Sequence, residues 1–165
     1  MTILTHNTFW FQGAPYAEDT PPGPDGGILR RLVSLYNQAA PDILCLQELQ
    51  SPETFEIVCA HLKREGCFCP GRELTPYGAG SFWATGKCVA LVDAWSSGSG
   101  VQRAWQIVEA SFGKQPLRVC NVHLPSGRQL GSCKAARQRI GELDEILRSC
   151  PDGPEVVLGD FNEYP

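Results

Sequence analysis

The sequence lacks the features that mark membrane-spanning and secreted proteins. No apolar run among the 165 residues approaches the roughly 18 residues that a membrane helix needs. The segment from Met1 to Asn7 has neither the basic start nor the long apolar stretch of a secretory signal. We therefore expect no membrane span and a cytoplasmic location.

Positive charge is also scarce. The chain has 14 Lys and Arg against 18 Asp and Glu, and its formal net charge is −4. Such a balance argues against a protein that holds a long nucleic-acid backbone by bulk electrostatics. It is compatible with an enzyme whose metal ions supply positive charge at a phosphate. Charge alone therefore leaves the substrate class open.

Cysteine is abundant instead, with eight residues in the chain. Without a secretory signal we expect reduced thiols rather than disulfides. Cys45 and Cys120 lie in apolar runs, where cysteine behaves as a small hydrophobic residue. The close pair Cys67 and Cys69 has no second pair or histidine spacing that would complete a zinc site. A redox or zinc protein therefore has little support.

Length and composition fit one domain, residues 1–165, in which strands and helices alternate. Proline and glycine between Pro15 and Gly27 predict a surface loop. Ser51 and Pro52 predict the start of a helix. The predicted strands are residues 2–7, 42–47, 81–85, 88–94, 101–112, 117–123 and 155–160. The predicted buried stripes of the three helices are Ile28, Leu32, Leu35 and Ala39; Phe55, Val58 and Leu62; and Ala136, Ile140, Leu143, Leu147 and Cys150.

Polar side chains stand where the predicted strands end, which is where α/β proteins place their sites. Glu48 directly follows such a strand, and Asn7, His123 and Asp160 each stand at the end of one. If the strands are neighbours, these side chains and Asn162 converge at one edge of the fold. Carboxylate oxygens suit Mg²⁺ or Mn²⁺ better than zinc.

Four short motifs resemble those of the endonuclease/exonuclease/phosphatase family, the DNase I-like metal-dependent phosphoesterases. Residues 42–48, DILCLQE, are similar to the family's D-I-x-x-L-Q-E motif, and residues 121–124, NVHL, to its N-x-H-L motif. Residues 159–162, GDFN, match its G-D-F-N motif, and residues 5–7 resemble its opening strand that ends in Asn. Each motif alone is weak, but the ordered set spans nearly the whole chain.

The resemblance implies an α/β fold, a four-layer sandwich of two packed β-sheets flanked by helices. It also implies roles for the matching residues. Glu48 would ligate a divalent metal, Mg²⁺ or Mn²⁺, with Asn7 close to the metal and the phosphate. Asp160 would orient or deprotonate the attacking water, and Asn162 would hold a phosphate oxygen or fix Asp160. His123 would contact the phosphate or protonate the leaving oxygen.

The family closes with an S-D-H motif on a later strand, and the sequence stops at Pro165 without one. We therefore expect the N-terminal two-thirds of the domain, missing its C-terminal strands. An open sheet edge makes self-association a further hypothesis.

The predicted function is metal-dependent hydrolysis of a phosphoester, most readily a phosphodiester, by in-line water attack. Nucleic acid, an inositol phosphate and a phospholipid headgroup all fit as substrates, because fold alone does not define one. The alternative is an inactive domain of the same fold that binds a phosphorylated ligand or a protein partner.

Two groups of residues near the motifs have two interpretations each. Basic residues after His123 form either a phosphate-facing patch or the solvated face of the last helix, and we prefer the second for Lys134 and Arg139. The other two basic residues of this group are Arg128 and Arg137. Phe9, Trp10 and Phe11 either stack on a base or cover the core, and we favour packing.

Overall fold

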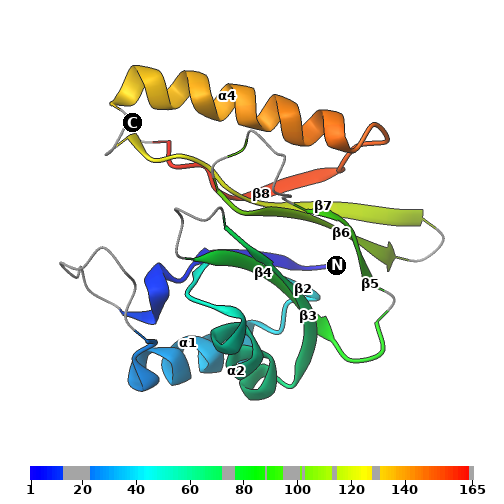
Figure 1. Ribbon diagram of the computed structural model, residues 1–165. Helices are drawn as coiled ribbons and strands as arrows, with labels where there is room; N and C mark the ends of the chain where they lie inside the picture. Colours follow the sequence, from blue (N-terminus) through cyan, green and yellow to red (C-terminus); the bar gives the residue numbers. More distant parts are fainter. Residues whose placement is uncertain are drawn as a thin grey trace.

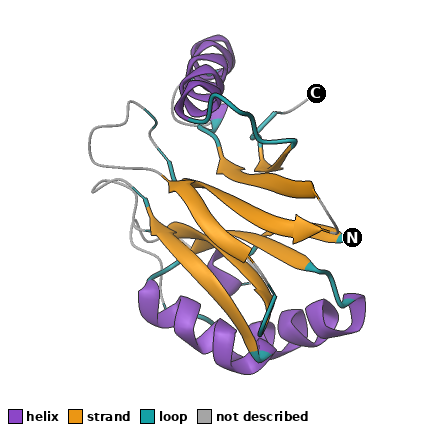
Figure 2. Cartoon of the chain, turned by 90° about the vertical axis from the view of Figure 1, so that its right-hand side faces the viewer, coloured by secondary structure: helices purple, strands orange, loops and turns teal. Residues whose placement is uncertain are grey.

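Two four-stranded β-sheets pack face to face and are covered on their outer faces by helices (Figure 1). The computed structural model describes residues 1–12, 23–71, 77–87, 89–94, 101, 103–112, 115–127 and 131–163. The predicted four-layer α/β sandwich is therefore confirmed: Figure 2 shows helices on either side of the two central layers of strands. None of the described helices is long and apolar enough to cross a membrane.

The first sheet, here sheet A, has the strand order β1-β2-β4-β3. Its strands are β1 (Ile3–Asn7), β2 (Ile43–Leu49), β3 (Arg64–Pro70) and β4 (Gly78–Ala84). β1 runs parallel to β2, and β4 runs antiparallel to both β2 and β3. A short 3-10 helix, η1 (Phe9–Phe11), follows β1.

Helices α1 (Gly26–Ala39) and α2 (Pro52–Leu62) cover the outer face of sheet A (Figure 1). Asp25 caps α1 by accepting hydrogen bonds from two backbone amides, at 2.8 Å each. Ser51 caps α2 by accepting one from Thr54 N at 3.2 Å, as its sequence predicts. Both helices pack on Leu44, Leu46 and other residues of the sheet A core.

The second sheet, here sheet B, has the strand order β5-β6-β7-β8. Its strands are β5 (Val89–Ala94), β6 (Trp105–Phe112), β7 (Gln115–His123) and β8 (Val156–Asp160). β5, β6 and β7 are antiparallel neighbours, and β8 runs parallel to β7. The long helix α4 (Ser132–Ser149) lies across the outer face of this sheet (Figure 1).

Two predicted helical stripes are correct only in part, because the most deeply buried row lies one position away. Ile28 and Leu32 pack against the core, as predicted, and so do Leu143 and Cys150. In α1 the buried residues are Leu29, Val33 and Tyr36, whereas Leu35 is 56% exposed. In α4 they are Ala135, Arg139, Glu142 and Ile146, whereas Ile140 is 69% exposed. Hydrophobic periodicity favours the neighbouring row of residues because that row is the more apolar one. β3 has no counterpart among the predicted strands.

Strand alternation explains which residues line the space between the sheets. Successive side chains of a strand point to opposite faces. In β2, Leu44 and Leu46 face the helices, while Ile43 and Cys45 face sheet B. In β7, Val119 faces sheet A, while Cys120 and Val122 face α4. The space between the sheets is therefore an apolar layer over most of its length.

Candidate active site

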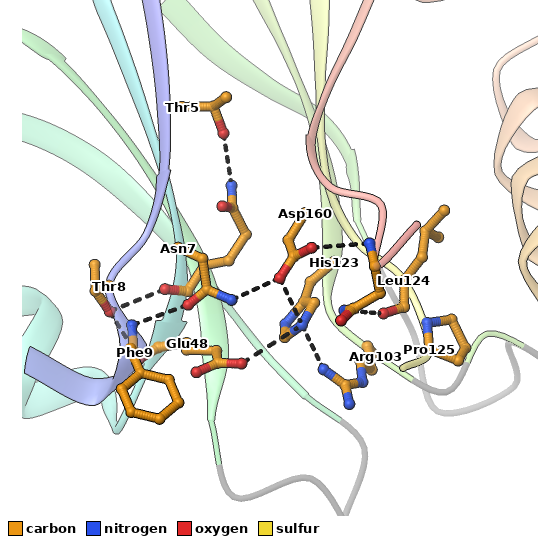
Figure 3. A network of polar contacts seen from close by, with 12 residues as sticks. Thr5, Asn7, Thr8, Phe9, Glu48, Arg103, His123, Leu124, Pro125 and Asp160 are labelled. Carbon is orange, nitrogen blue, oxygen red and sulfur yellow. Dashed lines mark hydrogen bonds and ion pairs between the residues drawn. The ribbon is translucent and has the colours of Figure 1, made fainter. Parts of the chain in front are cut away.

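The predicted site residues converge at one end of the layer between the sheets. Figure 3 shows Asn7 and Glu48, from sheet A, facing His123 and Asp160, from sheet B. One ligand atom each from Glu48, His123 and Asp160 lies within 4.8 Å of the others. His123 Nε2 lies 3.6 Å from Glu48 Oε1 and 3.7 Å from Asp160 Oδ2. The site therefore draws its side chains from the ends of strands in both sheets.

A β-bulge gives Glu48 its position. It lies inside β2 rather than after it, and the pairing of β2 with β4 shifts between Gln47 and Leu49. Glu48 has a φ of 58°, which is uncommon for a residue other than glycine. Because of the bulge, Leu49 packs in the helix-facing core, and the Glu48 side chain does not follow the alternation of the rest of the strand. The carboxylate can therefore face the site.

Hydrogen bonds from Asn7 and Asn162 orient the carboxylate of Asp160. Asn7 Nδ2 donates to Asp160 Oδ2 at 2.7 Å, and Asn7 Oδ1 accepts from Phe9 N at 2.9 Å. The backbone N–H of Asn162 donates to Asp160 Oδ1 at 2.8 Å. The Asn162 side chain donates to Leu124 O at 2.7 Å, next to His123. Both oxygens of the Asp160 carboxylate are therefore oriented.

His123 is the most deeply buried polar side chain of the site, with 2% of its surface exposed. Burial, assisted by the nearby charge of Arg103, holds its pKa well below the usual value of 6.5. The imidazole is therefore neutral at pH 7, and its contacts with the two carboxylates are polar contacts rather than salt bridges. The Arg103 guanidinium donates a hydrogen bond to His123 Nε2.

Arg103 and Tyr77 complete the site and were not predicted. The Tyr77 ring stacks on His123 with 5.6 Å between ring centroids, and Arg103 lies 5.7 Å from the centre of the Tyr77 ring. Burial raises the pKa of Tyr77 to about 12, so the phenol keeps its proton. Both residues lie just outside strands and belong to none of the four motifs. The pairing of β6 with β7 brings Arg103 to His123, and the packing of β4 against β7 brings Tyr77 there.

The basic residues after His123 do not behave alike. Arg139 was predicted on the solvated face of the last helix, and this is wrong because 7% of it is exposed. Its guanidinium donates to Pro125 O at 3.3 Å and to Glu163 at 2.6 Å. Lys134 is exposed, as predicted, whereas Arg128 lies outside the described residues. A cavity of about 250 Å³ lies between Arg139 and Asn162.

Of the aromatic residues after Asn7, Trp10 and Phe11 are buried, as the packing interpretation predicts. Phe9 is 37% exposed. All three have positive φ angles, between 47° and 57°. η1 is therefore a left-handed turn directly beside Asn7.

The donor set fits a hard divalent cation. Glu48 and Asp160 offer carboxylate oxygens and His123 offers a neutral ring nitrogen. Asn7 lies beside them, with its amide nitrogen on Asp160 and its amide oxygen on Phe9 N. Mg²⁺ and Mn²⁺ favour oxygen donors of this kind. Two carboxylates beside a neutral imidazole also form a negatively charged cluster, and a bound cation would balance this charge.

No protein-family model and no curated protein matches the sequence. Solved structures do match its fold. D. rerio TDP2 in complex with a single-strand DNA product aligns over 100% of this chain, with 20% identity and a TM-score of 0.65. The human Nocturnin catalytic domain with bound sulfate aligns over 82%, with 23% identity and a TM-score of 0.57. ANGEL2, a 2′,3′-cyclic phosphatase in complex with adenosine-2′,3′-vanadate, aligns over 81%, with 16% identity and a TM-score of 0.62.

The alignments cover only part of each solved structure. They extend over 62% of the TDP2 chain, 57% of Nocturnin and 43% of ANGEL2. All three are members of the endonuclease/exonuclease/phosphatase superfamily. The family resemblance of the four motifs is thus confirmed at the level of the fold: this chain has the DNase I-like fold of that superfamily.

Proposed function

We propose that the protein is a divalent-metal-dependent phosphoester hydrolase that acts by in-line attack of water, with a phosphodiester as the favoured substrate. The observation that carries this proposal is the cluster of Glu48, His123 and Asp160, whose ligand atoms lie within 4.8 Å of one another. These residues come from three strands of two sheets, so their convergence is a property of the fold and not of one local motif.

Glu48 and Asn7 would hold the metal ion, Mg²⁺ or Mn²⁺. A bound ion of this kind neutralises charge on phosphate oxygens and so favours attack on phosphorus. Asp160 would orient and deprotonate the attacking water, because both of its oxygens are held by neighbouring amides. Asn162 would keep Asp160 in this orientation or hold a phosphate oxygen.

His123 has two expected roles, and its surroundings favour one of them. A neutral imidazole with a lowered pKa carries no extra proton to give to a leaving oxygen at pH 7. Contact with the phosphate is therefore the role we assign to it. Arg103, which bonds His123, would add a positive charge beside the phosphate.

Nucleic acid is the substrate we would test first, because D. rerio TDP2 was solved with a single-strand DNA product. Inositol phosphates and phospholipid headgroups stay in the substrate panel. The chain spans less than two thirds of each of the three solved structures described above. Turnover by these 165 residues alone is therefore part of the proposal. We also propose that they form one domain and act in the cytoplasm.

The decisive experiment measures hydrolysis of bis(p-nitrophenyl) phosphate and of short DNA and RNA strands with Mg²⁺, Mn²⁺ or EDTA. We expect turnover with a metal ion and none with EDTA. Asp160→Asn should lower kcat on the order of a hundredfold or more, because it removes the base but keeps the shape of the side chain.

Asp152→Asn is the matched control, since this carboxylate is 86% exposed and takes no part in the site. Its turnover should equal that of the unmodified chain. Equal turnover by Asp160→Asn, or turnover that persists in EDTA, would contradict the proposed mechanism.

A second candidate is a domain of the same fold that binds a phosphorylated ligand or partner without turnover. The hydrogen bond from Arg103 to His123 favours this binding function, because the bond occupies the ring nitrogen that faces the carboxylates. This function predicts no hydrolysis together with measurable binding of a phosphorylated ligand. Calorimetric titration with non-hydrolysable nucleotide analogues separates the two functions.

A further inference from the structure

The candidate site is divided between two sheets that no β-ladder joins in the described part of the chain. Asn7 and Glu48 belong to sheet A, whereas His123 and Asp160 belong to sheet B. Most of the layer between the sheets consists of apolar side chains such as Ile43, Val108 and Val119. Apolar contact is non-directional, so it holds the sheets together without fixing how one lies along the other.

Two buried amides close this layer at the end that bears the site. Gln47 is 1% exposed and Asn121 is 0% exposed. Gln47 Nε2, on sheet A, donates to Asn121 Oδ1, on sheet B, at 2.6 Å. A hydrogen bond of this length depends steeply on distance and angle, so it defines the relative position of the two strands.

Each amide is also fixed to sheet A by further bonds. Asn121 Nδ2 donates to Leu46 O at 3.3 Å and to Gly80 O at 3.2 Å, so a residue of β7 is bonded to β2 and β4. Gln47 Nε2 lies 3.0 Å from Thr5 Oγ1 of β1. The pair therefore joins three strands of sheet A to the strand that carries His123.

Both amides are close neighbours of site residues along and across the strands. Gln47 precedes Glu48 and pairs with Asn7 in the β1–β2 ladder. Asn121 lies two residues before His123 on the same face of β7, and His123 pairs with Asp160 in the β7–β8 ladder. Any shift between the sheets at this pair would change the spacing of the carboxylates directly.

We infer that Gln47 and Asn121 are positioning residues, whose hydrogen bond sets the spacing of Glu48 relative to His123 and Asp160. The inference rests on the proposed function for its consequence, which is the affinity of the site for a divalent ion. Its structural half, the alignment of the two sheets at the site, is independent of that function.

The test uses the double variant Gln47→Met/Asn121→Leu, in which both partners are replaced by apolar side chains of similar size. Removing both partners together avoids leaving one buried amide unpaired. We expect the variant to fold but to bind Mn²⁺ more weakly, on the order of ten- to a hundredfold. Mn²⁺ affinity is measured by electron paramagnetic resonance without substrate.

Gln106→Met is the matched control. Gln106 is also 0% exposed and also spans the sheets, with Nε2 3.4 Å from Cys67 O and from Ala79 O. It lies on β6, which carries no metal ligand of the proposed site. We expect this variant to be less stable and yet to bind Mn²⁺ with unchanged affinity.

A second readout needs no metal. Asn7 Nδ2 donates to Asp160 Oδ2 across the two sheets, so the ¹H–¹⁵N signal of the Asn7 side-chain amide reports on the spacing of the sheets at the site. We expect this signal to shift and exchange faster in the double variant but not in Gln106→Met. If the double variant fails to fold, the single variant Gln47→Met is measured instead. It keeps both hydrogen bonds from Asn121 to backbone carbonyls, and its Asn7 signal should change in the same direction.

Unchanged Mn²⁺ affinity and an unchanged Asn7 signal in a folded Gln47→Met/Asn121→Leu protein would overturn the inference. An equal loss of Mn²⁺ affinity in Gln106→Met would overturn the inference as well, because any buried amide between the sheets would then have the same effect on the site. If the unmodified chain binds no Mn²⁺, the metal step of the proposed function fails, and the Asn7 signal alone decides the positioning inference.

Discussion

Gly159 adjoins Asp160 and has no room for a side chain. Its φ is 138°, and a Cβ atom there would lie 1.9 Å from the carbonyl oxygen of Val122. Gly159→Ala must therefore separate β8 from β7 or distort the backbone that presents Asp160. We expect it to lower the free energy of unfolding by about 3 kcal/mol or more, and to abolish metal-dependent turnover. Urea unfolding measures the first effect.

Gly141→Ala is the control for this substitution, because a Cβ atom at Gly141 meets nothing within 4 Å. Gly141 lies inside α4, where alanine is the better helix former by about 0.5–1 kcal/mol. The control should therefore be neutral or slightly stabilising. A Gly159→Ala protein as stable as the unmodified chain would show that the β7–β8 contact is looser than the structure indicates.

Single residues show what the sequence could and could not predict about the site. Asn7, His123 and Asp160 each end a strand, so a pattern of apolar residues followed by a polar one was enough to find them. Arg103 and Tyr77 follow no such pattern. Their place beside His123 depends on long-range strand pairing and on the packing of the two sheets, which local sequence does not encode.

At the scale of single elements, α4 offers the sharpest test of the fold. Ile146 is 0% exposed and packs under the helix, whereas Ile140 is 69% exposed. We expect Ile146→Ala to lower the free energy of unfolding by about 2–5 kcal/mol, because it leaves a cavity in the core. Ile140→Ala should change it by less than about 0.5 kcal/mol. A larger loss of stability in Ile140→Ala than in Ile146→Ala would contradict the structure and support the stripe that the sequence predicts.

The error in that stripe has a physical cause. The row of α4 that faces sheet B includes Arg139 and Glu142, which are buried because their polar groups find partners. Hydrophobic periodicity assumes that the buried face is the apolar face, and here the outer row is the more apolar one. β3 was missed for a related reason: Gly66 and Pro70 weaken its pattern, and pairing with β4 supplies its stability.

For the whole molecule, the sheet edges determine how copies can meet. β8 pairs with β7 on one side, and the described residues place no strand on its other side. An unpaired edge strand offers its backbone groups to another chain. We expect the average sedimentation coefficient to rise with protein concentration, and the double variant Ile140→Gln/Leu147→Gln to behave in the same way. A sedimentation coefficient that stays at the monomer value would contradict edge pairing. If the unmodified chain associates and the double variant does not, the association belongs to the exposed face of α4.

Burial of thiols on both faces of the sheets also determines how stability depends on pH. Cys45, between the two sheets, and Cys120, between sheet B and α4, are both 0% exposed, and burial raises the pKa of each thiol from 9.0 to about 12. The unfolded chain releases these protons near pH 9 while the folded chain keeps them, so stability is intact below pH 9 and falls as the pH rises above it. At pH 10 each thiol should reduce the free energy of unfolding by about 1.4 kcal/mol.

Urea unfolding at pH 7.5 and at pH 10 measures this loss, and Cys45→Ala should make it smaller by about one thiol's share, about 1.4 kcal/mol. Cys133→Ala is the control, since Cys133 is exposed and should leave the pH dependence unchanged. Burial of the thiols, rather than the number of cysteines, is then what makes the protein sensitive to alkali. An equal effect of both variants would mean that the layer opens to water below pH 10, and the site that spans it would open as well.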